Sequence, residues 1–237
     1  MIIGVLSAMQ KEHAQLTTLL GEAHTETDGN YSFTIGQLGQ NTLILLQCGM
    51  GKVNAAVGAT TLIRRYHPDA IISTGCAGGL DAKQKVMDVV VSTETAYHDV
   101  TIPGCEPGQM QGLPARFRAE EELVENAPLS SLDTQLSAGL IVTGDQFISD
   151  VAQLEKIKAV FPDALAVDME SAAIAQTCFL HAVPFVSFRI ISDTPGADKH
   201  LQQYLNFWDE MADHSFAVTR RFLTALPSQF AKLPFAD

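Results

Sequence analysis

Acidic side chains follow several short apolar runs of this chain, and they are the first residues that could do chemistry. Glu12 comes after the run at 2–6, Glu170 directly follows 165–169, and Asp193 lies just beyond 185–191. A carboxylate buried without a partner is costly or takes up a proton. These acids therefore predict a site for a polar ligand, where carboxyl groups are suited to general acid-base catalysis.

Small residues follow two other runs. Gly75-Cys76-Ala77-Gly78-Gly79 and Gly144-Asp145-Gln146-Phe147-Ile148 are expected to form turns, and neither has the Gly-Lys-Ser/Thr ending of a phosphate loop. Gly49-Met50-Gly51-Lys52 also stops short of that motif, so we expect a structural turn with Lys52 in solvent. Ligand sites of parallel α/β sheets form beyond the carboxyl ends of the strands, so these turns and the three acids should converge.

Each acid also has a simpler interpretation. Glu12 could favour the dipole of a helix start, Glu170 could cap the helix beginning near Ser171, and Asp193 could be a turn residue before Thr-Pro-Gly. His98 and Asp99 are adjacent, which more often indicates a local hydrogen bond than a catalytic pair. The arrival of the acids at the same end of successive strands favours a site.

The elements that must position these residues are short strands alternating with helical patterns. Expected strands lie at 2–6, 31–35, 42–47, 70–74, 86–92, 140–143, 165–169 and 185–191, and expected helices at 10–20, 53–66, 151–160, 171–181 and 206–226. This alternation predicts an α/β fold with a mixed, largely parallel twisted sheet between layers of helices. The stretch 31–47 predicts an antiparallel hairpin within it.

The chain has no linker composition, repeat or low-complexity tract, so we expect one domain over residues 1–237. Its least regular part is 98–117, where three prolines and three glycines argue against a regular element. A loop of this length in a compact domain is usually functional or mobile.

Composition limits the class of partner. The 237 residues are 46% hydrophobic, which is ample for a sizeable core, and 15 basic against 27 acidic residues give a net charge of -12. This charge repels nucleic acids and anionic membranes, so we expect neither as a partner. Scattered cysteines, no zinc-ligand spacing and no membrane-length run predict a cytoplasmic protein without a structural metal.

Seven motifs occur in order over nearly the full chain: GVLSAMQKE, GKVNAA, STGCAGGL, VVVS followed by YHDV, TGDQFI, AVDMESAAIA and FRIISD. Together they make the chain resemble the purine nucleoside phosphorylase and uridine phosphorylase superfamily. Within it, the motifs are similar to those of bacterial methylthioadenosine/S-adenosylhomocysteine nucleosidases. The resemblance implies a nucleoside phosphorylase-like fold.

It also implies hydrolysis of the bond between adenine and ribose in 5'-methylthioadenosine and S-adenosylhomocysteine, without a cofactor or metal. By this resemblance, Glu12 activates the attacking water and Glu170 holds the ribose hydroxyls, with Met169 against the sugar. Asp193 donates a proton to the departing adenine, while Phe147 stacks on the purine.

Further contacts follow from the same resemblance. The backbone of Ile148 would bind the purine edge, Ser192 would support Asp193, and the remaining substrate-binding residues would be Ala8, Met9, Cys76, Ala77, Gly78, Arg189 and Tyr204. Phe207 competes with Tyr204 as the later pocket aromatic. Asp168 stands where many relatives have Glu, and it is expected either to be paired in the core or to support the site. The resemblance also implies a homodimer.

Three alternatives remain at this stage. A phosphorylase of the same fold would need arginines near the first strand turn and before Gly75, yet no arginine precedes Arg64. A nucleosidase acting on aminodeoxyfutalosine would share the same motifs. A non-catalytic nucleoside sensor would be expected to lose one of the three acids, and all three are present.

Overall fold

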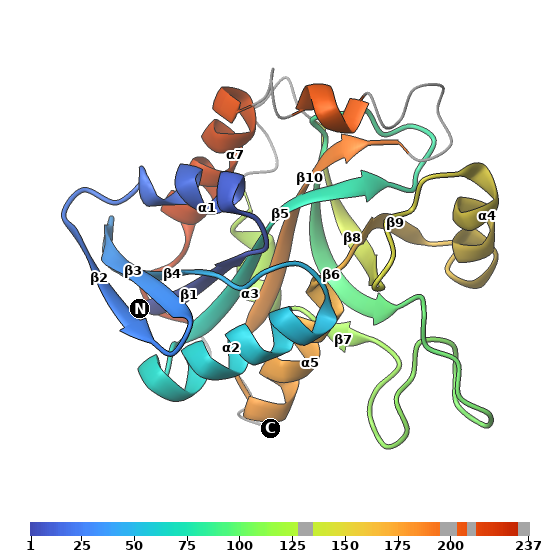
Figure 1. Cartoon of the computed structure of the whole chain (residues 1–237), viewed down its shortest axis with the longest axis horizontal. Coiled ribbons are helices and arrows are strands. Elements are labelled where there is room, and N and C mark those ends of the chain that lie inside the picture. Colours follow the sequence, from blue (N-terminus) through green and yellow to red (C-terminus); the bar gives the residue numbers. More distant parts are fainter. Residues whose placement is uncertain (128–134, 195–202, 208–211, 232–237) are drawn as a thin grey trace.

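The computed structural model describes residues 1–127, 135–194, 203–207 and 212–231. Strands and helices alternate along most of this length (Figure 1). The strands are β1 (Ile2–Ser7), β2 (Ala23–Asp28), β3 (Tyr31–Leu38), β4 (Asn41–Gln47), β5 (Ala70–Gly79), β6 (Val89–Tyr97), β7 (Phe117–Arg118), β8 (Leu136–Thr143), β9 (Ala164–Asp168) and β10 (Phe185–Asp193). The helices are α1 (Gln10–Thr17), α2 (Lys52–Tyr66), α3 (Glu121–Glu125), α4 (Val151–Val160), α5 (Ser171–His181) and α7 (Ala212–Ala225).

All ten strands join one mixed sheet. Parallel pairings connect β1 with β4 and β5, β5 with β10, and β8 with β6 and β9. The hairpin of β3 and β4, and the pairings β2–β3, β10–β6, β6–β7 and β5–β9, are antiparallel. The expectation of an α/β fold built on a mixed sheet with an antiparallel hairpin is confirmed.

Part of the sheet closes on itself. Strand β5 pairs with both β10 and β9, while β6 and β8 complete the connection between those two strands. The ring β5–β10–β6–β8–β9 therefore leaves β1, β4, β3 and β2 as an extension from one side of β5. Ring closure brings the ends of β5, β9 and β10 together, and these ends carry most of the candidate site residues.

The central strands carry apolar side chains on both faces of the sheet, and helices pack against each of these faces. In β1, Ile3 and Val5 pack into one cluster with residues of α1 and α7, whereas Leu6 packs into another with residues of α2 and α5. Side chains of a strand alternate between its two faces, so β1 contributes to both layers. The helices lie accordingly on opposite sides of the sheet (Figure 1).

The structure corrects three expectations about local structure. Gly75–Gly79 is no turn, because β5 continues through it and pairs with β10 and then β9. Strand β2 was missed because its sequence, AHTETD, is mostly exposed and lacks an apolar face; its pairing with β3 holds it in place. Between 98 and 116 the chain is irregular as expected, but Phe117 and Arg118 form β7.

The helices expected at 53–66, 151–160 and 171–181 agree with α2, α4 and α5 to within a few residues. The helix expected at 10–20 ends earlier, because α1 stops at Thr17. The expected helix at 206–226 crosses 208–211, which lie outside the described residues, and α7 accounts for its later part. Within the described part of the chain, none of the helices is long and apolar enough to cross a membrane.

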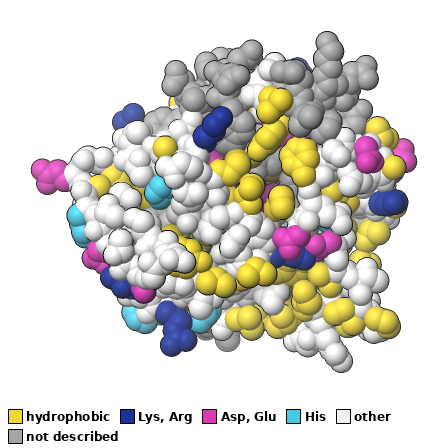
Figure 2. Space-filling model, in the orientation of Figure 1, with side chains coloured by type: hydrophobic (Ala, Val, Ile, Leu, Met, Phe, Trp, Pro, Cys, Tyr) yellow, Lys and Arg dark blue, Asp and Glu magenta, His cyan; other side chains and the backbone are white. Residues whose placement is uncertain are grey.

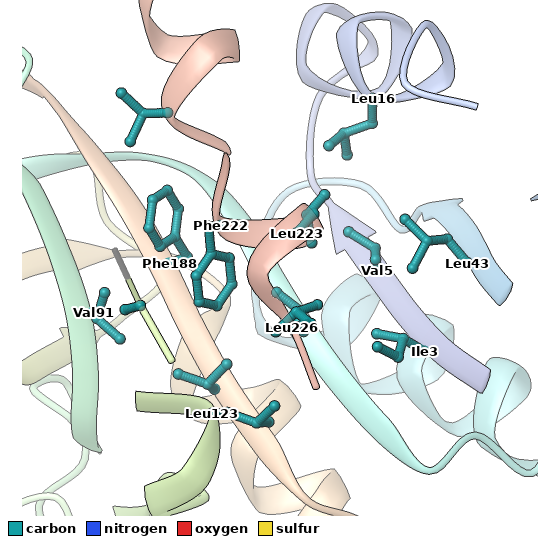
Figure 3. Packing of buried hydrophobic residues seen from close by; sticks show 14 of the residues in the cluster. Ile3, Val5, Leu16, Leu43, Val91, Leu123, Phe188, Phe222, Leu223 and Leu226 are labelled. Carbon is teal, nitrogen blue, oxygen red and sulfur yellow. The ribbon is translucent and has the colours of Figure 1, made fainter. Parts of the chain in front are cut away.

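The cluster on the α7 side is anchored by an aromatic pair. Phe188 of β10 and Phe222 of α7 stack with ring centroids 4.5 Å apart and planes inclined by 13° (Figure 3). Both side chains are fully buried. This pair attaches α7 to the same strand that carries Asp193 at its end.

We expect Phe222→Ala to lower the free energy of unfolding by about 3–5 kcal/mol, because it removes a buried aromatic ring and leaves a cavity. Urea denaturation measures this loss. Val160→Ala is the control, since Val160 of α4 is 49% exposed and its truncation should cost much less. Equal losses in the two variants would contradict the assignment of Phe222 to the core.

Candidate active site

One pocket collects almost every predicted site residue. It lies where β5, β9 and β10 end and is bounded by the starts of α1 and α5. Its predicted lining residues are Ala8, Met9, Glu12, Cys76, Ala77, Gly78, Phe147, Ile148, Met169, Glu170, Ser192, Asp193 and Tyr204. Met50, Gln146, Val167 and Asp168 also line it. Arg189 is the one predicted site residue that does not line this pocket; it is buried behind the lining residues.

Glu12 is fixed by the start of α1. Its Oε2 accepts hydrogen bonds from the backbone N–H groups of Ala8 (3.0 Å) and Met9 (2.9 Å), and its Oε1 accepts one from Cys76 (3.1 Å). The first two bonds satisfy free N–H groups of the helix start, so the simpler interpretation of Glu12 holds as well. The third ties α1 to β5 and keeps the carboxylate in the pocket wall.

Gly75 makes this position possible. A Cβ at residue 75 would lie 2.6 Å from Oε1 of Glu12 and 2.6 Å from Nη1 of Arg189. Neither group could remain in place beside such a side chain. The glycine therefore serves the close approach of charged side chains to the β5 backbone.

Glu170 is held between a backbone donor and a cation. It precedes α5, but its side chain makes no capping hydrogen bond to that helix. Instead, Oε1 accepts a 2.9 Å hydrogen bond from the N–H of Gly51, and Oε2 lies 3.7 Å from Nη2 of Arg189. Glu170 is thus the N-cap residue of α5 by position, but its side chain does not cap the helix, and the Gly49–Lys52 turn holds its carboxylate instead.

Arg189 and Asp168 form an ion pair beneath the pocket. Arg189 is 1% exposed, and its Nε lies 2.7 Å from Oδ2 of Asp168. Thr143 Oγ1 donates to Oδ1 of Asp168 at 2.5 Å, and Ser171 donates to its Oδ2. Arg189 Nη2 also donates to Ser73 Oγ at 2.9 Å. Asp168 is thus paired in the core, which is one of the two roles expected for it from the sequence.

One buried guanidinium lies near three acids, and the pKa values of two of them, Glu12 and Glu170, are shifted by burial. Burial raises the pKa of the Glu12 carboxyl above 4.5, against the opposing effects of Arg189 and of the backbone N–H groups. Burial also raises the pKa of Glu170 from 4.5 to about 7; Arg189 opposes this shift and the charge of Asp168 adds to it. Both carboxyls are consequently more basic than in water.

Asp193 is the last residue of β10 and also lines the pocket. It is 3% exposed, and its Oδ1 accepts a 2.6 Å hydrogen bond from Ser192 Oγ. Ser192 Oγ lies 3.3 Å from the carbonyl oxygen of Ala77 as well. The expected support of Asp193 by Ser192 is confirmed as a contact.

An aromatic wall closes the outer part of the pocket. The rings of Phe147 and Tyr204 meet edge to face with centroids 5.3 Å apart, and Tyr204 Oη lies 3.7 Å from Met9 Sδ. Phe207 is buried in the core cluster of α7 instead. Tyr204 is therefore the pocket aromatic. Phe147 is 46% exposed and lines the pocket.

Two expectations near the site are wrong. Lys52 is not free in solvent, since its Nζ lies 2.7 Å from Oδ2 of Asp99 and its side chain is 23% exposed. His98 and Asp99 form no local hydrogen bond, because Nε2 of His98 is buried without a hydrogen-bond partner in the described structure. Nothing in the short-range sequence pattern connects Lys52 to a residue 47 positions later.

Sequence analysis missed the lining residues Met50, Gln146 and Val167. Gln146 precedes the predicted Phe147 and Val167 lies in β9 shortly before Met169, whereas Met50 belongs to the turn at 49–52 that was expected to be only structural. The positions of Met50 and Gln146 beyond strand ends were a usable signal, but the side-chain types carried none. The pocket thus combines carboxyl groups, one of which is held by a serine, with an aromatic wall, a set suited to acid-base chemistry on a planar ligand.

A family model described as "Phosphorylase superfamily" matches residues 2–224. Among curated proteins, the chain is 39% identical over 231 residues to the 5'-methylthioadenosine/S-adenosylhomocysteine nucleosidase of Anoxybacillus flavithermus, covering 95% of this chain and 99% of the relative. It is 41% identical over 220 residues to the nucleosidase of the same name from Bacillus subtilis, covering 91% and 95% of the two chains.

Solved structures agree with these sequence matches. A 5'-methylthioadenosine/S-adenosylhomocysteine nucleosidase from Colwellia psychrerythraea in complex with adenine has a TM-score of 0.91 and 36% identity, with 97% of both chains covered. The Neisseria meningitidis nucleosidase in complex with methylthio-immucillin-A has a TM-score of 0.89 and 36% identity, covering 95% of this chain and 99% of that one.

We expect Asp168→Asn to lower the free energy of unfolding by about 3 kcal/mol, because it leaves the buried Arg189 cation without its closest anion. Denaturant unfolding at neutral pH measures the change. The control is Asp163→Asn, which breaks the partly exposed 2.6 Å pair with Arg116 and should cost no more than about 1 kcal/mol. A loss in Asp168→Asn no greater than in the control would contradict the analysis.

The raised pKa of Glu170 predicts a distinct pH dependence of stability. Between its usual pKa of 4.5 and the folded value of about 7, the folded protein binds more protons at this residue than the unfolded chain does. The contribution of Glu170 to stability therefore falls as the pH rises through this interval. Glu170→Gln cannot titrate but keeps an oxygen for the Gly51 N–H, so it should gain stability relative to the parent with rising pH. Unfolding curves from about pH 5 to about pH 8 measure this; a constant difference would refute it.

Proposed function

The chain belongs to the methylthioadenosine/S-adenosylhomocysteine nucleosidases of the phosphorylase superfamily, and we propose that Glu12, Glu170 and Asp193 are its catalytic residues. The enzyme is an N-glycosyl hydrolase. It cleaves 5'-methylthioadenosine and S-adenosylhomocysteine and releases adenine together with the thioribose. The observation that carries the assignment of residues is the convergence of the three acids on one pocket with an aromatic wall.

Cleavage of an N-glycosidic bond develops positive charge on the ribose and negative charge on the departing base. A carboxylate near the sugar and a proton donor near the base both bind this transition state more tightly than they bind the substrate. Two acids near the Arg189 cation, Glu12 and Glu170, and a third held by Ser192, Asp193, supply carboxyl groups for both ends of the breaking bond.

In our proposal, Glu12 orients and deprotonates the attacking water. A carboxylate has about four lone-pair directions. Three are occupied by the backbone N–H groups of Ala8, Met9 and Cys76, which leaves one on Oε1 for a water molecule. The raised pKa of Glu12 makes this oxygen a stronger base than a carboxylate in water.

Glu170 would bind the ribose hydroxyls. Its Oε1 receives one N–H from Gly51 and its Oε2 faces Arg189, so each oxygen keeps a lone pair for the ligand. Met169, the preceding lining residue, would pack against the sugar. The nearby guanidinium helps to keep Glu170 ionised, which favours the positive charge that develops on the ribose.

Asp193 would protonate the departing adenine. Ser192 donates a hydrogen bond to Oδ1 of this carboxyl group and so helps to orient it at the pocket wall. Phe147, Tyr204 and the backbone of Ile148 would hold the purine beside it, and the small side chains of Ala8, Cys76, Ala77 and Gly78 leave room for a flat ring. Arg189 lies behind the wall, and we assign it support of Glu170 rather than direct substrate binding.

Charge in the pocket favours water over phosphate as the nucleophile. Among the described lining residues there is neither lysine nor arginine. The buried cation Arg189 is already engaged by Asp168, and Glu12 and Glu170 would repel a phosphate dianion. Uncharged water meets no such barrier.

We further propose that the chain acts as a single domain, as a homodimer and in the cytoplasm. Exposed hydrophobic side chains support the dimer: Val53 and Val57 on α2, and Phe179 and Leu180 on α5, are each roughly half to three-quarters exposed. Hydrophobic side chains gather over the lower part of the face shown in Figure 2, where α2 and α5 lie side by side. Such surfaces commonly mark protein interfaces.

The test is incubation of the purified protein with 5'-methylthioadenosine, with and without phosphate, and identification of both products. We expect adenine and free methylthioribose at a rate indifferent to phosphate. Asp193→Asn should lower that rate at least ~100-fold, because it removes the proton donor. A sugar 1-phosphate that forms only with phosphate would make the enzyme a phosphorylase and refute the proposal.

A further inference from the structure

A charged cluster joins three segments that are distant in the sequence. Lys52 Nζ lies 2.7 Å from Oδ2 of Asp99 and 4.0 Å from Oδ2 of Asp145. The N–H of Asp145 donates to Oδ2 of Asp99 at 3.0 Å, and the N–H of Lys52 donates to Oδ1 of Asp145 at 2.8 Å. The cluster thus connects the start of α2 with the segments that follow β6 and β8.

Each end of this cluster is adjacent to a residue of the pocket. Gly51, next to Lys52, donates its N–H to Glu170. Asp145 directly precedes Gln146, Phe147 and Ile148, which also line the pocket. The turn that holds the ribose-binding carboxylate and the turn that holds the purine are therefore attached to each other through Lys52, Asp99 and Asp145.

The two turns approach closely. A Cβ at Gly51, whose φ is +91°, would lie 3.0 Å from Oδ1 of Asp145. A side chain here would be strained by the backbone conformation and would push the turns apart. Asp99 and Asp145 carry like charges and repel each other. The contact between the two turns therefore depends on the attraction of both carboxylates to the Lys52 ammonium.

The pair of Lys52 and Asp99 is shielded from solvent, in contrast to a typical surface ion pair. Their side chains are 23% and 15% exposed, and Asp145 is 48% exposed. Burial raises the pKa of Asp99, but the Lys52 ammonium and the Asp145 N–H outweigh it and hold the pKa below its usual value. Asp99 is therefore ionised and its oxygen strongly bonded at neutral pH.

We propose that Lys52 and Asp99 are positioning residues for the hydrolysis: they hold the purine-binding turn at 145–148 against the turn that orients Glu170. Neither touches the reacting atoms. The inference rests on the proposed function, because it assigns the two turns to the two halves of a nucleoside. This role accounts for the partial burial of the Lys52 side chain, which does not line the pocket.

The experiment compares Asp99→Asn, Lys52→Met and the double variant by kcat and KM for 5'-methylthioadenosine and by the Kd for adenine from titration calorimetry. Loss of a hydrogen bond between charged groups should raise KM and the adenine Kd about tenfold in each single variant, with a smaller change in kcat. Because both substitutions break the Lys52–Asp99 contact, the effects of the two single variants should combine less than additively in the double variant. Lys52→Arg keeps the cation and should recover most of the adenine affinity.

Asp163→Asn is the control, because it breaks an ion pair of similar length, 2.6 Å, made by residues that do not line the pocket. It should leave KM and the adenine Kd unchanged. The inference is overturned if Asp99→Asn and Lys52→Met leave both constants within about twofold of an active parent. It is also overturned if their effects add, or if Asp163→Asn weakens adenine binding equally. A parent that does not cleave the substrate would instead refute the proposed function.

Discussion

The burial of one guanidinium among three carboxyl groups is the constraint on which the site depends. Arg189 sits in the middle of a core strand at 1% exposure, and its direct ion pair with Asp168 leaves Glu170 and Glu12 only partly compensated. Removing charges from water is expensive, and one cation cannot neutralise three anions. Burial raises the pKa of Glu12 and of Glu170, two of the acids that line the pocket, against the opposing effect of Arg189.

The fold supplies what this cluster needs. Serine and threonine hydroxyls from β5, β8 and α5 complete the hydrogen bonds of Asp168 and Arg189, so that the buried polar groups are satisfied. Gly75 leaves space for the charged side chains beside the β5 backbone. Ring closure of the sheet brings the ends of β5, β9 and β10 to one place, and hydrophobic packing of both sheet faces makes that arrangement rigid.

The site separates two kinds of acid. Glu12 and Glu170 share the buried cation, with most of their remaining partners being backbone N–H groups, whereas Asp193 is held by a neighbouring hydroxyl at the end of β10. Different surroundings let carboxyl groups of similar intrinsic acidity take different roles. The aromatic wall of Phe147 and Tyr204 comes from two further segments, so the relative placement of turns matters as much as the acids themselves.

The sequence by itself determined the layered α/β class, the positions of most strands and helices, and the list of acids beyond strand ends. These follow from local hydrophobic periodicity and from the rule that parallel strands end at a common edge. Only the tertiary structure decided that Gly75–Gly79 continues a strand, that the polar segment Ala23–Asp28 joins the sheet, and that Arg189 pairs with Asp168. It also decided that Lys52 meets Asp99, 47 residues away. The local sequence of each segment does not indicate which residue it will contact. The burial of these side chains and the distances between them are set by how the whole chain packs.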